Sequence, residues 1–384
     1  MADVRPIPAL RYSESVVPDL ATVVTPPYDV IPEDQLAGYR DRSPNSFIRL
    51  IRPGTDYAGA AELLAEWTER GVLVEDPAAI YVHEVDFDGR RRRDLVAGLR
   101  LQDYADRVVL PHELTHRGPK EDRLALMRAT GAAMEPLWFA YEGAGTPLPA
   151  LVDEAVADAS SVEFKFAGAT HRLWVGTDPE WQRRVATAFD ALPVLIADGH
   201  HRYETTLLHS TEVGGSEDAA SRFTPAVLTD IDDPGLEVLP THRLLKAGVK
   251  VVGGDPVASL EEALRAIEGR CAAAHYADGV FQVLTLEGEV AVVELHQQVI
   301  DNVLGRRSAE EMIEYTRDPA EAVRWVDGGR GVAAFLLGAP DLHGVLKLAR
   351  EGKTMPQKST YFNPKPPSGM LLHRLDPDRI LPRA

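Results

Sequence analysis

Residues 192–210, LPVLIADGHHRYETTLLHS, form the stretch that decides the fold of this chain. The apolar run at residues 194–197 is long enough for one buried strand. It ends at Asp198 and Gly199, a helix-capping residue and a residue that is free to adopt unusual backbone dihedrals. From His200 onward the sequence is helical in character. A strand, a tight turn and a helix N-terminus present backbone N–H groups and a positive dipole end to an anion, so the stretch predicts a phosphate-binding turn.

The first helical turn after the glycine carries side chains suited to phosphate. His200, His201 and Arg202 supply two imidazoles and a guanidinium, and we expect all three to contact phosphate groups. Glu204 follows one helical turn after His200 and is placed to orient its imidazole. Asp198 is expected to cap the helix within the same site.

The string DGHHRYET at residues 198–205 resembles the phosphate-binding turn of the ParB/sulfiredoxin-like superfamily. Sulfiredoxins carry Gly-Gly-Cys-His-Arg-Tyr-Glu there, and archaeal free-serine kinases carry a related string. Gly199 and residues 201–204 match residue for residue, whereas His200 stands where sulfiredoxins have their reactive cysteine. Sulfinic-acid chemistry is excluded at this position, because the only cysteine, Cys271, lies far along the chain. The expectation of nucleotide phosphate binding is unaffected by this replacement.

Composition and charge exclude several classes of protein. The 384 residues are 45% apolar, enough for a sizeable core, and suggest two or three units of ordinary domain size. With 59 acidic against 41 basic residues the formal charge is −18, which argues against a nucleic-acid partner because phosphate backbones are bound by basic surfaces. A single cysteine fits a reducing compartment, and no apolar run approaches the ~20 residues of a membrane span. We therefore expect a cytoplasmic protein with no nucleic-acid or membrane partner; the oligomeric state is left open.

The sequence predicts two parts. Residues 1–250 are expected to form the nucleotide-binding core with N-terminal elaborations. Residues 251–384 are expected to form an α+β lobe, because the texture changes after Gly253 and Gly254 to regular helical and strand patterns.

The Pro/Gly/Lys-rich segment 352–370 predicts an ordered loop that packs back on the site and presents Lys358, Ser359 and Thr360. A disordered tail would carry fewer aromatic residues. We expect deletion of residues 353–384 to leave most of the fold intact and to abolish activity.

Residues 112–116, HELTH, satisfy the zinc-binding H-E-x-x-H pattern literally. That pattern requires an uninterrupted helix, but Pro111 precedes it and Gly118-Pro119 follow it, leaving about two helical turns. A loop that brings His112, Glu113 and Thr115 to the end of a strand is favoured. Lys120 and Arg123 would then lie on the following helix.

Several local elements are predicted from their turn and cap residues. Asp178 is expected to cap a helix that starts at Pro179, and Asp88-Gly89 to form a hairpin turn. Residues 46–51 are expected to be a strand, and the arginines at 90–93 the solvated end of the hairpin.

The string TPPYDVI at residues 25–31 is a rigid turn, because two prolines restrict the backbone. Asp29 on this turn is either a capping residue or a site carboxylate; both interpretations remain open.

Six strings in the same order over nearly the full chain resemble the domain-of-unknown-function family 1015, some of whose members are labelled ParB-like. The strings are PPYDVI (26–31), PHELT (111–115), KEDRL (120–124), ADGHHRYET (197–205), PTHRLL (240–245) and MPQKSTYFNPK (355–365). The resemblance implies an α+β fold with a ParB/sulfiredoxin-like core and additional mixed α/β lobes, and phosphoryl transfer through the free-serine kinases of that superfamily.

The predicted activity is a nucleotide-dependent phosphotransferase that uses ATP or ADP with Mg²⁺ and acts on a small hydroxylated acceptor such as free serine. Glu113 or Asp29 would orient or deprotonate the acceptor hydroxyl, and a phosphohistidine at His200 is chemically feasible. The residues expected to bind the nucleotide are Asp198, Gly199, His200, His201, Arg202, Glu204, Lys358, Ser359, Thr360, Lys120 and Arg123.

Two other classes of function remain open. A non-enzymatic, ParB-like nucleotide-binding switch would keep the phosphate turn without needing an acceptor-side carboxylate. A zinc hydrolase would use His112 and His116 with His200 or His201 as ligands.

Overall fold

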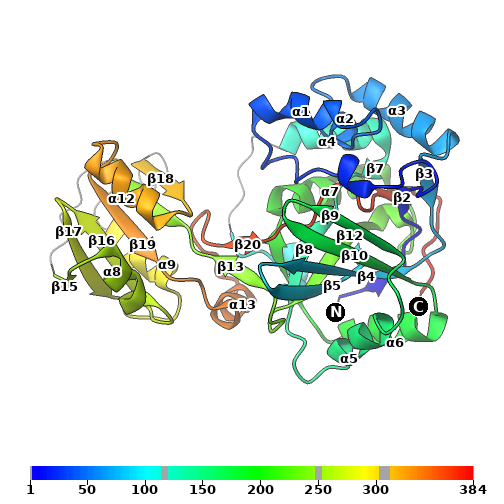
Figure 1. Cartoon of the computed structure of the whole chain (residues 1–384). Helices are drawn as coiled ribbons and strands as arrows, with labels where there is room; N and C mark the ends of the chain where they lie inside the picture. Colours follow the sequence, from blue (N-terminus) through cyan, green and yellow to red (C-terminus); the bar gives the residue numbers. More distant parts are fainter. Residues whose placement is uncertain (1, 114–119, 247–252, 302–311, 384) are drawn as a thin grey trace. The chain divides into compact units, whose positions relative to one another are not determined.

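The computed structural model of the chain describes residues 2–113, 120–246, 253–301 and 312–383, and has the predicted α+β fold (Figure 1). The chain divides into two compact units. Unit 1 comprises Met1–Leu110, Thr115–Leu236 and Pro364–Ala384, and unit 2 comprises Pro111–Leu114 and Glu237–Asn363. The two units interleave along the sequence. The division at residues 250 and 251, which was based on sequence texture, stays a prediction.

Unit 1 is built on a nine-stranded sheet. Eight of its strands follow the order β6-β11-β8-β12-β5-β4-β10-β9, and the ninth, β1, pairs with β5. The strands are β1 (Val4–Arg5), β4 (Ile80–Phe87), β5 (Arg90–Arg100), β6 (Val109–Leu110), β8 (Leu137–Tyr141), β9 (Val162–Phe166), β10 (Ala169–Gly176), β11 (Val194–Asp198) and β12 (Phe223–Asp230). β11 runs parallel to β6, and β12 runs parallel to β8; the other pairs are antiparallel. Two short antiparallel pairs complete the unit: β2 (Leu10–Tyr12) with β3 (Leu73–Glu75), and β7 (Ala132–Ala133) with β21 (His373–Arg374).

Helices cover this sheet. In Figure 1, α5 and α6 lie below it, and α3, α4 and α7 lie above it. The α-helices of unit 1 are α1 (Leu36–Asp41), α2 (Ile48–Ile51), α3 (Tyr57–Glu69), α4 (Lys120–Thr130), α5 (Leu148–Ala155), α6 (Pro179–Phe189) and α7 (His200–Val213). Its short 3-10 turns are η1 (Leu20–Thr22), η2 (Glu33–Gln35), η3 (Tyr104–Asp106) and η4 (Ala220–Arg222). The core between sheet and helices includes Phe139 of β8, Val185 of α6 and Tyr203 of α7, all inaccessible to solvent.

Local sequence signals account for several element boundaries. The side chain of Asp178 accepts a hydrogen bond from the Trp181 N–H at 2.7 Å, and α6 begins at Pro179, which confirms the predicted cap. Asp88 and Gly89 both have positive φ, at 48° and 74°, and join β4 to β5 as the predicted hairpin.

The strand predicted at residues 46–51 is wrong, because residues Ile48–Ile51 form helix α2. Short apolar runs do not distinguish a buried strand from a buried helical turn. Phe47, Leu50 and Ile51 are buried, and α2 contacts α3, so packing selects the helix.

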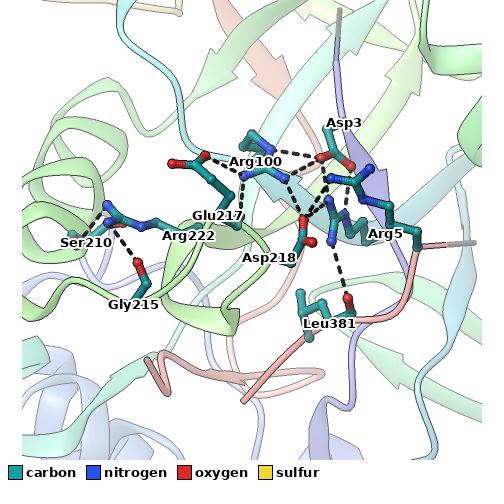
Figure 2. A network of polar contacts seen from close by, with 10 residues as sticks. Asp3, Arg5, Arg100, Ser210, Gly215, Glu217, Asp218, Arg222 and Leu381 are labelled. Carbon is teal, nitrogen blue, oxygen red and sulfur yellow. Dashed lines mark hydrogen bonds and ion pairs between the residues drawn. The ribbon is translucent and has the colours of Figure 1, made fainter. Parts of the chain in front are cut away.

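An arginine and aspartate network joins both chain ends to β5 (Figure 2). The buried Arg5 guanidinium contacts Asp3 at 2.9 Å and Asp218 at 2.6 Å, and donates to the carbonyl of Leu381 at 3.2 Å. Arg100 pairs with the same Asp3 at 2.7 Å. The pKa of Asp218 is lowered to about 2, chiefly by its hydrogen bond with Arg5.

The C-terminal segment is part of the core of unit 1. Five apolar residues there are 2% exposed or less: Met370, Leu371, Leu372, Leu375 and Leu381. The expectation that deleting residues 353–384 preserves most of the fold is therefore wrong. The deletion would remove these five side chains and expose to water the apolar residues that they cover.

Unit 2 contains a six-stranded antiparallel sheet with the order β15-β17-β16-β19-β14-β18. The strands are β14 (His242–Leu245), β15 (Asp255–Val257), β16 (Ala272–Ala277), β17 (Val280–Thr285), β18 (Ile313–Thr316) and β19 (Ala333–Leu337). A separate antiparallel pair joins β13 (Glu237–Leu239) to β20 (Tyr361–Asn363). The helices are α8 (Leu260–Ile267), α9 (Ala291–Leu295), the π-helical turn η5 (His296–Ile300), α12 (Pro319–Asp327) and α13 (Leu342–Arg350). Ala263 and Ile267 of α8 and Ala322 of α12 pack on the sheet.

No helix among the described residues is both long and apolar enough to cross a membrane.

Candidate functional site

The turn between β11 and α7 has the predicted geometry. β11 ends at Asp198, Gly199 is the N-cap residue with φ of 100°, and α7 begins at His200. A Cβ atom on Gly199 would lie 3.0 Å from Nη2 of Arg202 and 3.1 Å from Cδ2 of Leu137. The left-handed backbone and this close approach both favour glycine. The strand, turn and helix predicted here are therefore confirmed.

Asp198 does not cap the helix as predicted, since α7 has no side-chain cap. Its carboxylate instead accepts a hydrogen bond from Arg202 Nη2 at 2.8 Å and pairs through Oδ1 with Lys365 Nζ. Burial acts to raise the pKa of Asp198, but the charges of Lys365 and Arg202 outweigh it and hold this pKa below its usual value. Asp198 is therefore a carboxylate shared by two cations.

The turn at residues 26–31 lies beside this group. Glu135 Oε1 accepts hydrogen bonds from the Tyr28 N–H at 3.1 Å and from the Ser368 hydroxyl. Burial acts to lower the pKa of Arg202, and the charges of Glu135, Asp198 and Asp29 more than offset it, so the guanidinium stays charged. Asp29 is exposed and also helps to raise the pKa of Lys365. The structure thus places Asp29 in the electrostatic surroundings of Arg202 and Lys365.

Arg123 lies at the edge of the same group. Its guanidinium is 4.3 Å from the centroid of the Tyr28 ring and donates to the Ile51 carbonyl at 2.7 Å. A cavity of about 40 Å³ lies between Arg123 and Arg202. This volume suits water and is too small for a nucleotide.

The remaining predicted side chains of α7 lie on its first turns. His200 is close enough to Asp198 for its charge to help lower the pKa of that carboxylate. The His201 carbonyl accepts a hydrogen bond from the Thr205 hydroxyl at 2.8 Å. Glu204 accepts one from the Tyr104 hydroxyl at 3.4 Å.

The other predicted residues form a second group, which lies within unit 2. Glu113 Oε1 accepts a hydrogen bond from the Ser359 N–H at 2.8 Å. His112 is buried, and its Nε2 is hydrogen-bonded with the Thr360 hydroxyl at 2.9 Å. The Met355 N–H donates to the His112 carbonyl at 2.7 Å. The strings PHELT and MPQKSTYFNPK, far apart in the sequence, therefore meet.

Arg243 holds the backbone around Lys358. This buried arginine donates to the carbonyls of Gln357 at 3.5 Å and Lys358 at 3.4 Å, and burial lowers its pKa to about 10. Lys358 has a left-handed backbone, with φ of 51°, and its ammonium group lies 5.4 Å from the centroid of the Tyr315 ring. Left-handed non-glycine residues are uncommon and cluster at functional positions. In the sequence, Arg243 belongs to the string PTHRLL and forms a basic pair with His242.

The structure describes only part of the zinc-binding pattern at residues 112–116. Thr115 and His116 lie outside the described residues, as does the side chain of Lys120, the first residue of α4. Within the described ranges, no three or more His, Cys, Asp or Glu side chains are grouped so that they could hold a metal ion.

Sequence reasoning missed a buried network behind the turn. Arg92 was expected in solvent but is inaccessible to it, with Nε 3.0 Å from Asp94 Oδ1 and Nη1 donating to the Pro364 carbonyl at 3.0 Å. His83 Nδ1 is 3.1 Å from Asp94 Oδ2, and His83 Nε2 is 3.0 Å from His171 Nδ1. Arg92 therefore fixes the residue that immediately precedes Lys365. The alternation of arginines in a half-buried strand was the available signal.

The fold and the turn define an α+β protein with a strand-turn-helix motif at Gly199. The chain belongs to the family described as "Protein of unknown function (DUF1015)", which it matches over residues 4–313. No curated protein matches the sequence.

Three solved structures with some similarity to this chain are the following. A free serine kinase in complex with AMP is 17% identical, covering 70% of this chain and 86% of that one, with a TM-score of 0.36. A conserved hypothetical protein from Pyrococcus furiosus is 17% identical over 76% and 95%, with a TM-score of 0.36. SbnI with a C-terminal truncation, from Staphylococcus aureus, is 12% identical over 70% and 82%, with a TM-score of 0.35. All three likenesses are distant.

Proposed function

We propose that this protein is a nucleotide-dependent phosphotransferase that uses ATP or ADP and phosphorylates a hydroxyl group of a small metabolite, with free serine as the first acceptor to test. The observation that carries the proposal is the turn at Gly199. It opens the N-terminus of a 14-residue helix beside two largely buried cations, Arg202 and Lys365.

Phosphate binding follows from the chemistry of this turn. The first N–H groups of a helix have no intrahelical acceptor, and the helix dipole favours an anion at this end. A guanidinium group has five N–H donors, and the described contacts of Arg202, to Asp198 and to the Pro136 carbonyl, use only part of that capacity. Arg202 can therefore also donate to phosphate oxygens.

The carboxylates divide into two roles. Both oxygens of Asp198 are engaged by cations, so Asp198 orients Arg202 and Lys365 and is poorly suited to hold a metal. Asp29 is exposed near the same two cations, and suits both a Mg²⁺ ion carried by the nucleotide phosphates and an acceptor hydroxyl. When bound, the nucleotide with its Mg²⁺ supplies the phosphoryl group and part of the charge neutralisation. We therefore propose that Asp29 orients or deprotonates the acceptor.

Glu113 and Lys358 remain predicted participants. The Glu113 carboxylate is engaged with the Ser359 N–H, which makes it a positioning residue for the segment that carries Lys358. His200 stays the candidate for a covalent phosphohistidine. Direct transfer is the simpler route, because it needs only positioned groups.

The test is to incubate the protein with ATP or ADP, Mg²⁺ and a panel of small hydroxyl compounds, serine first, and to follow phosphorylated products by ³¹P NMR. We expect Asp29→Asn to lower turnover by about 10²–10⁴-fold while leaving nucleotide affinity nearly unchanged. Asp34→Asn, an exposed carboxylate five residues further on, is the matched control and should retain activity.

Two outcomes contradict parts of the proposal. Absence of ATP and ADP binding to the folded protein rejects the nucleotide site altogether. Tight nucleotide binding without phosphorylation of any acceptor favours the ParB-like switch instead.

A further inference from the structure

Unit 2 contains a pocket whose lining includes Ser359 but neither Glu113 nor Lys358. Its volume is about 930 Å³, within the range of small-molecule sites. It lies at one end of the six-stranded sheet, where β18 and β19 end and β14 and β16 begin. The register pairs His242 with Thr316 and Ala273 with Leu337, which brings these four strand ends together.

One wall of the pocket is apolar. It is formed by Leu264 and Ile267 at the end of α8, by Leu337 at the end of β19, and by Val290 and Val292 at the start of α9. This wall suits the hydrocarbon part of a ligand, whose burial would supply binding free energy in proportion to its area.

Most charged residues around the pocket are already engaged. Arg265 pairs with Glu261 at 2.7 Å, and Glu289 pairs with Lys347 at 2.5 Å. Asp341 accepts a hydrogen bond from the Gly344 N–H at 3.1 Å, as the cap of α13. The charges of these groups are already balanced by contacts within the protein and do not require a charged ligand.

Arg317 differs from them. Its exposed guanidinium stacks on the ring of Tyr361, 4.0 Å from the centroid, and no carboxylate among the described residues pairs with it. A stacked guanidinium keeps its edge donors in a planar fork, which matches a carboxylate.

His242 adds a neutral donor to the same pocket. Its Nδ1 accepts the Leu337 N–H at 3.2 Å, so the ring proton of the neutral imidazole is on Nε2. No described residue accepts a hydrogen bond from that nitrogen. Burial lowers the pKa of His242 to about 4, so the ring is neutral at pH 7.

We propose that this pocket binds a small organic monocarboxylate, with its carboxylate group on Arg317 and His242 and its apolar body against α8, α9 and Leu337. Four carboxylates line the pocket, Glu261, Glu268, Glu289 and Asp341, against three arginines, Arg265, Arg270 and Arg317, so the lining favours a single negative charge over a multiply charged phosphate. A single negative charge with a hydrocarbon chain fits both features. The pocket is lined by residues of unit 2 alone.

The only cysteine of the protein, Cys271, lines the pocket and provides a reporter. The experiment measures the rate of Cys271 alkylation in the full-length protein with hexanoate, acetate, hexan-1-ol or hexylamine present at equal ionic strength. Hexanoate binding is measured in parallel by saturation-transfer NMR. We expect saturating hexanoate to slow alkylation by about threefold or more, and the other three compounds to have little effect, since only hexanoate combines the charge with the chain.

Variants then locate the contact. Arg317→Gln should weaken hexanoate binding by about tenfold or more, because a charge-assisted hydrogen-bonded pair is lost. Arg324→Gln, an exposed arginine on α12 that does not line the pocket, should leave binding unchanged. Absence of a hexanoate signal overturns the proposal. So does binding that neither protects Cys271 nor depends on Arg317, and so does equal protection by hexan-1-ol.

Discussion

Lys365 and Asp198 form an ion pair across 167 positions of sequence, and the pair brings the C-terminal segment to the turn at the start of α7. Arg202 shares the same carboxylate, and Arg92 holds the carbonyl of the residue before Lys365. The turn is therefore supported by groups from three separate parts of the chain.

Replacing Lys365 tests this pair. In Lys365→Ala, Asp198 keeps Arg202 but loses one of two cations, and burial then raises its pKa. We expect the free energy of unfolding at pH 7 to fall by about 1–3 kcal/mol, and its further loss toward acid pH to be shallower than in the wild type, because the folded variant binds a proton on Asp198 more readily. Urea denaturation across pH measures both. In a double-mutant cycle with Asp198→Asn, additive effects would show that the two residues are not coupled.

Gly199→Ala tests the left-handed turn. The new Cβ atom would contact Arg202 and Leu137, and φ of 100° is unfavourable for alanine, so we expect a loss of stability of about 1–2 kcal/mol. The free energy of nucleotide binding should fall by more than the free energy of unfolding does, because the N–H groups that would donate to the phosphates are displaced. Gly214→Ala at the other end of α7, where φ is 72° and no atom lies near the added Cβ, is the control for backbone strain alone. Nucleotide affinity unchanged in folded Gly199→Ala would place the nucleotide elsewhere.

Arg92→Met should be strongly destabilising. The variant leaves the solvent-inaccessible Asp94 without its cation and removes the donor to Pro364, at a cost of about 3–5 kcal/mol. Arg91→Met, whose side chain is 55% exposed, should change stability by no more than about 0.5 kcal/mol. The double variant Arg92→Met with Asp94→Asn should recover part of the loss in a urea titration. Equal effects of the Arg91 and Arg92 variants would contradict the buried network.

Buried histidines predict acid sensitivity. Burial lowers the pKa of His373 to about 4, whereas an unfolded histidine has a pKa of about 6.5. Below pH 6.5 the unfolded chain binds a proton that the folded chain does not, so this residue's contribution to stability is present above pH 6.5 and is lost as the pH falls toward 4. His373→Gln can still donate to the Ala220 carbonyl and should show a shallower decline of melting temperature over this window. Parallel curves for the variant and the wild type would reject the assignment.

Lys358→Asn separates structure from function at the second group. Asparagine tolerates the left-handed backbone, so stability should stay within about 0.5 kcal/mol of the wild type. If Lys358 neutralises developing charge, phosphotransfer should fall by about 10²-fold. Lys353→Asn, an exposed lysine on the same segment, is the matched control. Full turnover in Lys358→Asn would remove Lys358 from the proposed site.

Local signals in the sequence were sufficient to predict the structural elements that depend only on neighbouring residues. The Asp178 cap, the Asp88-Gly89 hairpin and the strand, turn and helix around Gly199 depend on backbone dihedrals and short-range hydrogen bonds. The six strings were sufficient to identify the family, because their order along the chain is specific.

Only the tertiary structure decided which polar groups are buried and which meet. Strand alternation puts Arg91 and Arg92 on opposite faces, but only the tertiary structure decides that the face of Arg92 is buried and that of Arg91 is exposed. The sequence predicted that Asp198 caps the helix, but its carboxylate oxygens accept hydrogen bonds from Lys365 and Arg202 instead. The physical reason is that burial and ion pairing are fixed by segments far apart in the chain, whereas capping and turns depend on neighbouring residues alone.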